Sequence, residues 1–155
     1  MLTESMEDYL EMIYRIVEKK GYIRAVDLAE ALEVQASSIT KMIQKLSRAN
    51  FVQYEKYRNI SLTPSGEKYG EFLIWRHRVL KDFLALLSNQ NNIEEQVEGI
   101  EHYITPSTMK LINGLISYFR QSPQQLKGLK EKQKQVNVPH QDSLHKLRAW
   151  VYKHN

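Results

Sequence analysis

The chain has 155 residues, 42% of them hydrophobic, which suffices to bury one sizeable core or two small ones joined by a helix. It contains no cysteine, which excludes disulfides, thiolate-bound zinc and cysteine nucleophiles, so any bound metal must take oxygen and imidazole ligands. Its net charge of +4 is spread unevenly along the sequence.

The first sixty residues predict a helix followed by a helix-turn-helix. Ser5 and Asp8 resemble a capping box, and apolar residues recur at helical spacing, which predicts a first helix from Ser5 to about Lys19. A short helix from about Val26, a turn over 33–35 and a longer helix opening at Ala36 or Ser37 predict a helix-turn-helix.

The longer of these helices has one apolar and one polar face. Ile39, Ile43 and Leu46 point inward with Met42, so the polar side chains face outward. Side chains of these types read base edges or hold phosphates when such a helix enters a major groove. A solvent-facing polar helix is also common in proteins that never touch DNA. The residues predicted to contact DNA here are Gln35, Ser37, Ser38, Thr40, Lys41, Gln44, Lys45 and Arg48.

Two short strands, 51–54 and 60–62, are predicted around a basic and aromatic turn, which is typical of the wing of a winged helix. In that turn Lys56 and Arg58 are predicted phosphate or minor-groove contacts, and Tyr57 is predicted to pack on a sugar or on its own hairpin. Between Val34 and Leu62 the sequence contains five basic residues and one acidic residue, a positive balance that suits binding to a phosphate backbone. The order of these parts along the chain favours DNA binding over the alternative of a polar helix that only faces solvent.

The second half of the chain predicts further helices. Thr63-Pro64 is a strong helix start, and the helix over 64–88 would carry His77 away from the wing. After a polar break, a helix from Ile93 holds Glu98, Glu101 and His102; Thr105-Pro106 and Ser122-Pro123 begin two more. An apolar stripe on the first of these two could face a core or a second subunit, and we predict a dimer interface. The stripe comprises Met109, Ile112, Leu115, Ile116 and Phe119.

Several carboxylates and imidazoles in these helices are candidate metal ligands. Glu98, Glu101 and His102 stand at i, i+3 and i+4, where like charges repel unless a cation lies between them. Asp8 and Glu11 form a second acidic pair, and His77 stands alone. An oxygen and imidazole set of this kind suits manganese or ferrous iron. The alternative is that these groups are ordinary solvated side chains, as we expect for Glu4, Glu7, Glu94 and Glu95.

Five segments together resemble the diphtheria toxin repressor family of metal-responsive regulators, and within it the manganese-responsive branch. They are SMEDYLEMIY, the helix-turn-helix DLAEALEVQASSITKMIQKL, the wing YEKYRNISLTPSGEKYG, WRH and VEGIEH. The iron-responsive branch has Met and Cys where this chain has Asp8 and Glu98, and hard oxygen in place of soft sulfur favours manganese. Longer members carry a C-terminal SH3-like domain, for which we expect this chain to be too short.

The resemblance implies a site for two Mn2+ ions between a DNA-binding and a dimerisation lobe. Its ligands would be Asp8, Glu11, His77, Glu98, Glu101 and His102. It further implies a homodimeric repressor of manganese uptake genes that binds double-stranded operator DNA when manganese is present. Two recognition helices must lie about 34 Å apart on such an operator, and a metal that bridges the lobes would favour this spacing.

The predicted fold is therefore mainly α, with an N-terminal winged helix-turn-helix, a two-stranded wing and a helical metal-binding and dimerisation domain. The predicted domains are 1–71, 72–137 and a tail, 138–155, of open role. No basic start precedes an apolar run and no stretch approaches the ~18 apolar residues of a membrane span, so we expect a soluble, cytoplasmic protein. The sequence leaves two alternatives: a metal-independent winged-helix regulator, and a di-metal carboxylate enzyme, which usually repeats a Glu-x-x-His motif that this sequence lacks.

Overall fold

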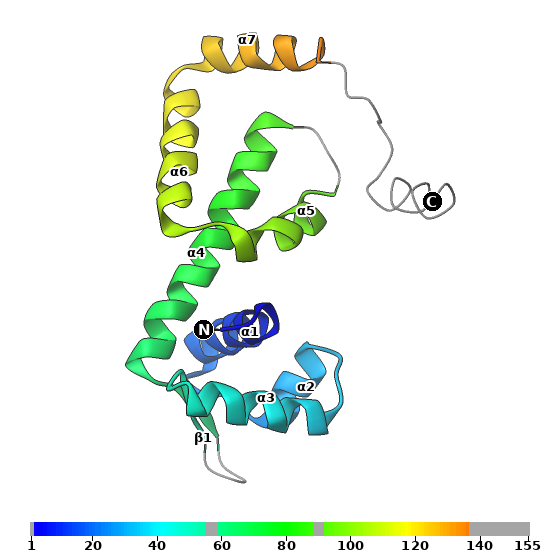
Figure 1. Ribbon diagram of the computed structural model, residues 1–155, viewed down its shortest axis with the longest axis vertical. Helices are drawn as coiled ribbons and strands as arrows, with labels where there is room; N and C mark the ends of the chain where they lie inside the picture. The colour runs from blue at the N-terminus through cyan, green and yellow to red at the C-terminus, as the bar shows by residue number, and fades with distance from the viewer. Residues whose placement is uncertain (1, 55–58, 89–91, 137–155) are drawn as a thin grey trace, which may run out of the picture. The chain divides into compact units, whose positions relative to one another are not determined.

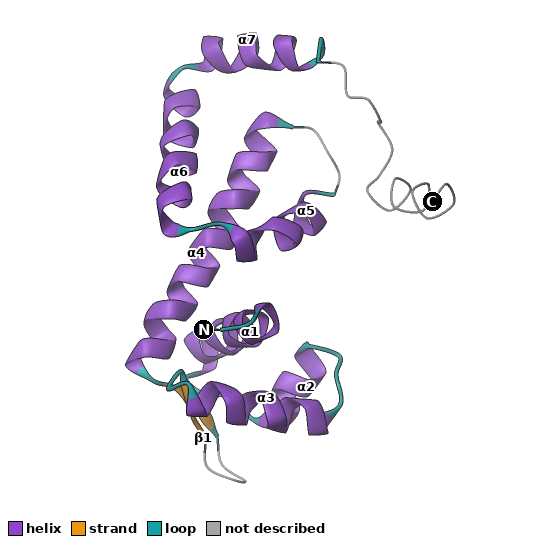
Figure 2. Cartoon of the chain, in the orientation of Figure 1, coloured by secondary structure: helices purple, strands orange, loops and turns teal. Residues whose placement is uncertain are grey.

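The structure is a computed structural model that describes residues 2–54, 59–88 and 92–136 (Figure 1). Within these ranges the chain is mainly helical, with one small antiparallel sheet, in agreement with the predicted fold class (Figure 2). It divides into two compact units, 1–116 and 117–155, and the first contains two hydrophobic cores. None of the helices in the described ranges combines the length and the apolar composition needed to span a bilayer.

The first helix, α1 (Glu4–Lys20), begins one residue earlier than predicted. Its N-cap is Thr3, whose hydroxyl accepts a bond from the Met6 N–H at 3.4 Å, so the prediction of Ser5 as cap is wrong. Both residue types cap helices well, and the apolar pattern alone cannot choose between neighbouring caps. The helix ends at Gly21, whose φ of 79° is a conformation that glycine adopts without strain.

The helix-turn-helix consists of α2 (Ala25–Ala31) and α3 (Ala36–Arg48). Ile39, Ile43 and Leu46 are fully buried, which confirms the predicted inward face of α3. Their core also takes in Leu10 and Ile13 from α1, so the recognition helix rests directly on the first helix of the chain. The polar face of α3 is left on the outside.

Two strands, β1 (Val52–Tyr54) and β2 (Ile60–Leu62), pair antiparallel, as predicted for the wing. Ile23, which precedes α2, pairs with Ile60 through two backbone hydrogen bonds of 3.1 and 2.7 Å. The wing is therefore tied to the helix-turn-helix through the backbone. The turn residues predicted to contact DNA, Lys56, Tyr57 and Arg58, lie outside the described residues.

The long helix α4 (Pro64–Leu87) starts as predicted, because the Thr63 hydroxyl accepts the Gly66 N–H at 3.0 Å. Leu73 belongs to the first core and Leu80 to the second, so one helix contributes to both. At Gly70 a Cβ atom would lie 2.6 Å from the Tyr14 ring, so the absence of a side chain lets α1 lie close against α4.

The second core forms where the far half of α4 meets α5 (Ile93–Ile100) and α6 (Pro106–Gln121). The α-helix stops at Ile100, and the next three residues form a 3-10 turn, η1 (Glu101–Tyr103), so the prediction of one helix holding Glu98, Glu101 and His102 is wrong. Pro106 limits how far a helix could continue, because the residue before a proline, here Thr105, is pushed out of the helical conformation. The change already at Glu101 is a 3-10 turn, which is frequent at the C-terminal end of an α-helix. The chain must leave the helix before α6 begins.

The predicted interface stripe on α6 divides into buried and exposed positions. Met109 and Ile116 are buried in the chain's own second core, and Ile112 packs against that core. Leu115 is 45% exposed and its neighbour Leu111 70% exposed, so apolar surface remains on the outer side of the helix. The dimer interface stays a prediction. Leu111 and Leu115 provide the exposed apolar surface that such an interface would bury.

The unit beyond residue 116 contains the end of α6 and the final helix, α7 (Pro123–Gln133), which begins at the predicted Ser122-Pro123. Within it, the rings of Tyr118 and Phe119 meet edge to face with centroids 5.4 Å apart. The predicted tail, 138–155, lies outside the described residues.

Candidate metal centre

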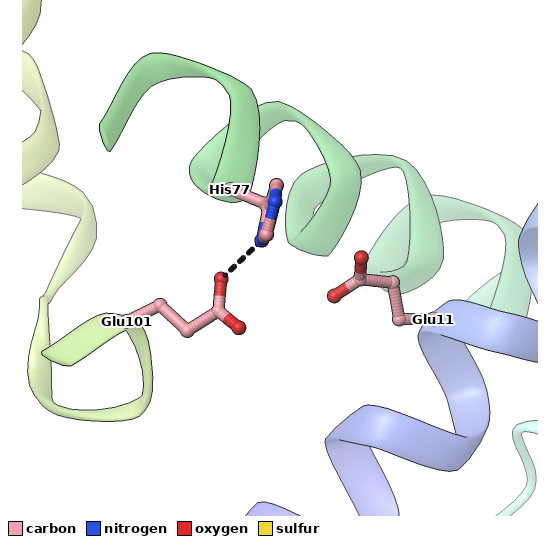
Figure 3. A group of neighbouring side chains, drawn as sticks. All are labelled: Glu11, His77 and Glu101. Atoms are coloured by element: carbon pink, nitrogen blue, oxygen red, sulfur yellow. Dashed lines mark hydrogen bonds and ion pairs between the residues drawn. The ribbon is translucent and has the colours of Figure 1, made fainter. Parts of the chain in front are cut away.

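Three predicted ligands, Glu11, His77 and Glu101, converge from three different elements (Figure 3). Glu11 is on α1, His77 on α4 and Glu101 at the first position of η1, and their side chains point toward one another. Each offers a ligand atom, and these atoms all lie within 4.8 Å of one another. Residues 90 positions apart in the sequence are thus brought together by the contact of α1 and η1 with the same stretch of α4.

The geometry and chemistry of this group fit a divalent cation. Carboxylate and imidazole donors bind such ions at about 2.0 to 2.2 Å, so donors on opposite sides of one ion are about 4.4 Å apart. A separation within 4.8 Å therefore needs only small side-chain movements to close on an ion. Glu101 is 4% exposed, and burial of a carboxylate is expensive unless a positive charge compensates it.

Contacts around His77 and Glu11 show how the group is held. The Nδ1 atom of His77 lies 3.0 Å from Oε2 of Glu101, and its Nε2 atom lies 3.7 Å from Oε2 of Glu94. Arg15 donates two hydrogen bonds to Oε1 of Glu11, at 2.6 and 3.0 Å. Because both bonds go to the same oxygen, the other oxygen of Glu11 is the one that would be offered to a cation.

His102 and Asp8 lie together beside this group. The Nε2 atom of His102 is 3.1 Å from Oδ1 of Asp8, which joins η1 to α1 a second time. Five of the six predicted ligands therefore fall into two adjacent contacts, one through His77 and one through His102. The sixth, Glu98, is exposed on the last turn of α5, and the described structure does not bring it into the group.

Two pKa shifts report the concentration of negative charge here. The pKa of the Asp8 carboxyl is raised by burial and by the charges of Glu101, Glu11 and Glu7, against the opposing effect of His102. The pKa of His77 is raised by its hydrogen bond to Glu101, although burial works the other way. The raised pKa values favour the protonated forms of Asp8 and His77, which reduce the net negative charge of the cluster. A bound cation would reduce that charge in the same way.

Glu7, which we expected to be solvated, is instead buried beside the candidate ligands. It is 9% exposed and accepts hydrogen bonds from Tyr69 at 2.7 Å and from Arg76 at 2.9 Å. Its Oε2 atom also lies 2.8 Å from Nδ1 of His102. These donors hold the pKa of Glu7 below its ordinary value, although burial, the largest influence, raises it. A signal was present in the sequence, because Glu7 stands three residues before the inward-facing Leu10.

Most of the predicted DNA-contact residues of α3 form its exposed face. Gln35, at the N-cap, and Ser37, Ser38, Lys41, Gln44, Lys45 and Arg48 are all exposed. Thr40 is half-buried, and its hydroxyl donates to the Ala36 carbonyl at 3.1 Å, so it would have to release this bond to contact a base.

A winged helix-turn-helix joined to a carboxylate and imidazole cluster defines the class of metal-responsive DNA-binding regulators. Two models of the iron dependent repressor family match the chain, the N-terminal DNA binding domain over residues 1–60 and the metal binding and dimerisation domain over residues 63–129. The chain belongs to this family, and it is a metal-responsive transcriptional repressor rather than an enzyme.

Curated relatives match most of the chain. It is 47% identical over 135 residues to the HTH-type transcriptional regulator MntR of Geobacillus thermodenitrificans (strain NG80-2), covering 86% of this chain and 96% of that protein. It is 44% identical over 137 residues to the protein of the same name from Bacillus subtilis (strain 168), covering 88% of this chain and 96% of that protein.

Solved structures agree with the fold. The manganese regulator SloR matches with a TM-score of 0.62 and 28% identity, covering 73% of this chain and 54% of that one. A manganese-dependent transcriptional repressor in complex with manganese matches with a TM-score of 0.59 and 27% identity, covering 71% of this chain and 51% of that one. This chain thus spans about half the length of these two structures.

Proposed function

We propose that this protein represses manganese uptake genes by binding operator DNA as a homodimer when a manganese site between its two lobes is filled. The observation that carries the proposal is the convergence of Glu11, His77 and Glu101 from α1, α4 and η1. Two kinds of relative support the choice of metal, because the chain resembles regulators named MntR and solved structures described as manganese regulators. The lack of thiolate donors agrees with a hard cation.

The proposed ligands are Asp8, Glu11, His77, Glu98, Glu101 and His102, holding two Mn2+ ions per subunit. Two adjacent contacts, His77 with Glu101 and His102 with Asp8, support a pair of neighbouring ions. Glu98 would join them by a side-chain movement from the end of α5. A bound ion supplies the positive charge that this carboxylate cluster would otherwise lack.

The response to metal follows from which elements supply the donors. α1 belongs to the DNA-binding core and η1 adjoins the second core, while α4 contributes to both. Donors drawn to a common centre hold α1 and η1 against α4 and restrict the relative motion of the two halves. In a dimer this restriction favours the recognition-helix spacing of about 34 Å that successive major grooves require. In the metal-free protein the relative motion of the two halves is lost only when DNA binds. The free energy of that ordering opposes binding, so the affinity for DNA is lower.

The proposed domains are the DNA-binding region 1–71, with α4 continuing from it, and the metal-binding and dimerisation region 72–137. The family models support a division near residue 60. The exposed apolar surface of α6, at Leu111 and Leu115, supports α6 as part of the dimer contact. The exposed polar face of α3 supports its placement in the major groove.

The experiment that tests this function measures binding of the full chain to promoter DNA of a manganese transporter gene by fluorescence anisotropy. Manganese, ferrous iron, zinc and a chelator are titrated separately, and a scrambled duplex serves as the control. We expect manganese to strengthen operator binding by about 5- to 150-fold over chelator, the usual range of allosteric coupling. Equal binding in manganese and in chelator would leave a metal-independent winged-helix regulator.

A further inference from the structure

We propose that Glu7 is a positioning residue that fixes the ring of His102 so that Nε2, and not Nδ1, is offered to the metal. This inference rests on the proposed function, because it concerns a ligand of the proposed manganese site. Glu7 itself is not among the predicted ligands. Its carboxylate lies 2.8 Å from Nδ1 of His102, on the far side of the ring from Asp8.

Both oxygens of Glu7 are already engaged by the protein. Oε1 accepts the Tyr69 hydroxyl at 2.7 Å, and Oε2 accepts Arg76 at 2.9 Å and faces His102 at 2.8 Å. A cation at Glu7 would have to displace a buried arginine, whose side chain is 3% exposed. The carboxylate is therefore built to accept hydrogen bonds and not to bind the ion.

The contact with Glu7 decides which nitrogen of His102 carries the hydrogen. An ionised carboxylate only accepts hydrogen bonds, so Nδ1 of His102 must donate. In the neutral imidazole the other nitrogen then has the free lone pair. That nitrogen, Nε2, lies 3.1 Å from Oδ1 of Asp8, a second proposed ligand. The Asp8 side chain is 53% exposed and can turn toward water, whereas the Glu7 side chain is 11% exposed and closer to the ring, so Glu7 is the acceptor that fixes the tautomer. A histidine that binds metal through one nitrogen commonly donates from the other to a carboxylate.

Glu7 can orient His102 because it is itself fixed. Its two other partners, Tyr69 and Arg76, lie two turns apart on α4, and the Arg76 guanidinium also lies 5.8 Å from the centre of the Phe72 ring. The carboxylate is thus held by the rigid long helix, while the ring that it orients belongs to the short turn η1. Through this arrangement α4 positions a ligand that it does not carry.

The first test measures the tautomer of His102 in the metal-free wild-type protein. Ring-nitrogen NMR on full-length protein labelled at histidine would be recorded at a pH above which the His102 signals no longer change, so that the neutral ring is observed. His102→Gln assigns the signals. We expect the Nδ1–H tautomer, whereas a free imidazole side chain favours Nε2–H. A dominant Nε2–H form of His102 would overturn the proposal, and this result depends on no variant of Glu7.

The second test removes the carboxylate. Glu7→Leu keeps a similar volume but offers Nδ1 no acceptor, so the tautomer should shift toward Nε2–H and manganese affinity, measured by calorimetry, should fall about 10- to 100-fold. Glu4→Leu is the matched control, because Glu4 accepts the Tyr103 hydroxyl at 2.6 Å and also links α1 to η1. We expect this control to keep both the wild-type tautomer and the wild-type affinity.

A double variant guards against a folding defect. Glu7→Leu alone leaves the buried charge of Arg76 without its partner, so Glu7→Leu with Arg76→Gln is measured in parallel and should show the same tautomer shift. If Glu7→Leu binds manganese as tightly as wild type while His102→Gln does not, the inference about Glu7 is overturned and the proposed function stands. If His102→Gln also binds manganese as tightly as wild type, both are overturned.

Discussion

Glu7 on α1 and Arg76 on α4 form a buried ion pair, with Nη2 of the arginine 2.9 Å from Oε2 of the glutamate. Their side chains are 11% and 3% exposed, respectively, so little water is available to replace either partner. This pair joins the first helix to the middle of the long helix, close to where Glu11 and His77 meet.

Loss of one partner of this pair should destabilise the fold. Arg76→Gln leaves the Glu7 carboxylate buried without its cation, and breaking a buried pair in this way costs about 3–5 kcal/mol. Urea unfolding followed by circular dichroism measures the change. Arg78→Gln, at an exposed position two residues further along α4, is the control and should stay close to wild type. Equal stability of the two variants would contradict the importance of the pair.

Loss of His77 should uncouple DNA binding from manganese. His77→Ala removes the donor that α4 contributes to the three-residue group, while the chain should still fold because His77 is only half-buried and belongs to neither apolar core. Operator affinity measured by anisotropy should then be the same with manganese and with chelator. Glu95→Ala, at an exposed position on α5, should keep the full response. A normal manganese response in His77→Ala would refute the bridging model.

Glu98 separates a one-ion from a two-ion site. Because the residue is exposed at the end of α5, apart from the Glu11, His77 and Glu101 group, its role as a ligand requires a second ion to draw it in. Glu98→Gln should therefore reduce the manganese content from two ions per subunit to one, as measured by calorimetric stoichiometry and elemental analysis. An unchanged content of two ions would remove Glu98 from the ligand set.

Manganese binding should weaken as the pH falls. Metal binds the deprotonated forms of carboxylate and imidazole, so it must displace any proton that these groups hold. The pKa of His77 is raised above 6.5 and that of Asp8 above 3.8, so both groups keep their protons to higher pH than usual and the loss of affinity sets in earlier. Calorimetry between about pH 6 and pH 8 should show affinity falling by about tenfold per pH unit for each proton displaced.

The pH dependence has its own control. His77→Gln removes the titrating imidazole, so the remaining manganese binding should change less steeply with pH over the same range. A variant with the same slope as wild type would show that protons compete elsewhere in the site.

The exposed face of α3 should determine operator recognition. Gln44→Ala removes a side chain able to form a pair of hydrogen bonds with a base edge, which should weaken operator binding by about 1–3 kcal/mol and leave binding to scrambled DNA nearly unchanged. Anisotropy with both duplexes in saturating manganese measures this difference. Gln125→Ala, at an exposed position of α7, is the control of the same residue type. Equal losses on both duplexes would mean that Gln44 contacts only the phosphate backbone.

Local signals in the sequence predicted the architecture well. Thr63-Pro64 predicted the start of α4, because the threonine hydroxyl supplies a cap and proline lacks the hydrogen that the first helical turn leaves unbonded. The inward face of α3 was predicted because three aliphatic residues at helical spacing can share a core only on one side. Such signals depend on neighbours within a few residues, so they can be recognised from the sequence without knowing the tertiary structure.

The candidate metal centre was harder to predict from the sequence alone. Treating Glu98, Glu101 and His102 as one helical face failed because the chain tightens into a 3-10 turn at Glu101, which is buried while Glu98 stays exposed. Glu7 was missed because its partners, Tyr69 and Arg76, stand more than sixty residues away. Helical spacing describes neighbours along one helix, whereas the centre is assembled from three elements.

The position of His77 on α4 also has a mechanical consequence. The helix is anchored near Leu73 in one core and near Leu80 in the other, with the imidazole between these anchors. At 1.5 Å per residue the stretch from Pro64 to His77 is roughly 20 Å long, so a tilt of about 6° at the imidazole would displace the start of the helix, beside the wing, by about 2 Å. α4 would thus act as a lever that pivots near the proposed ligand His77, and a small change of helix angle there is magnified at its far end, beside the wing.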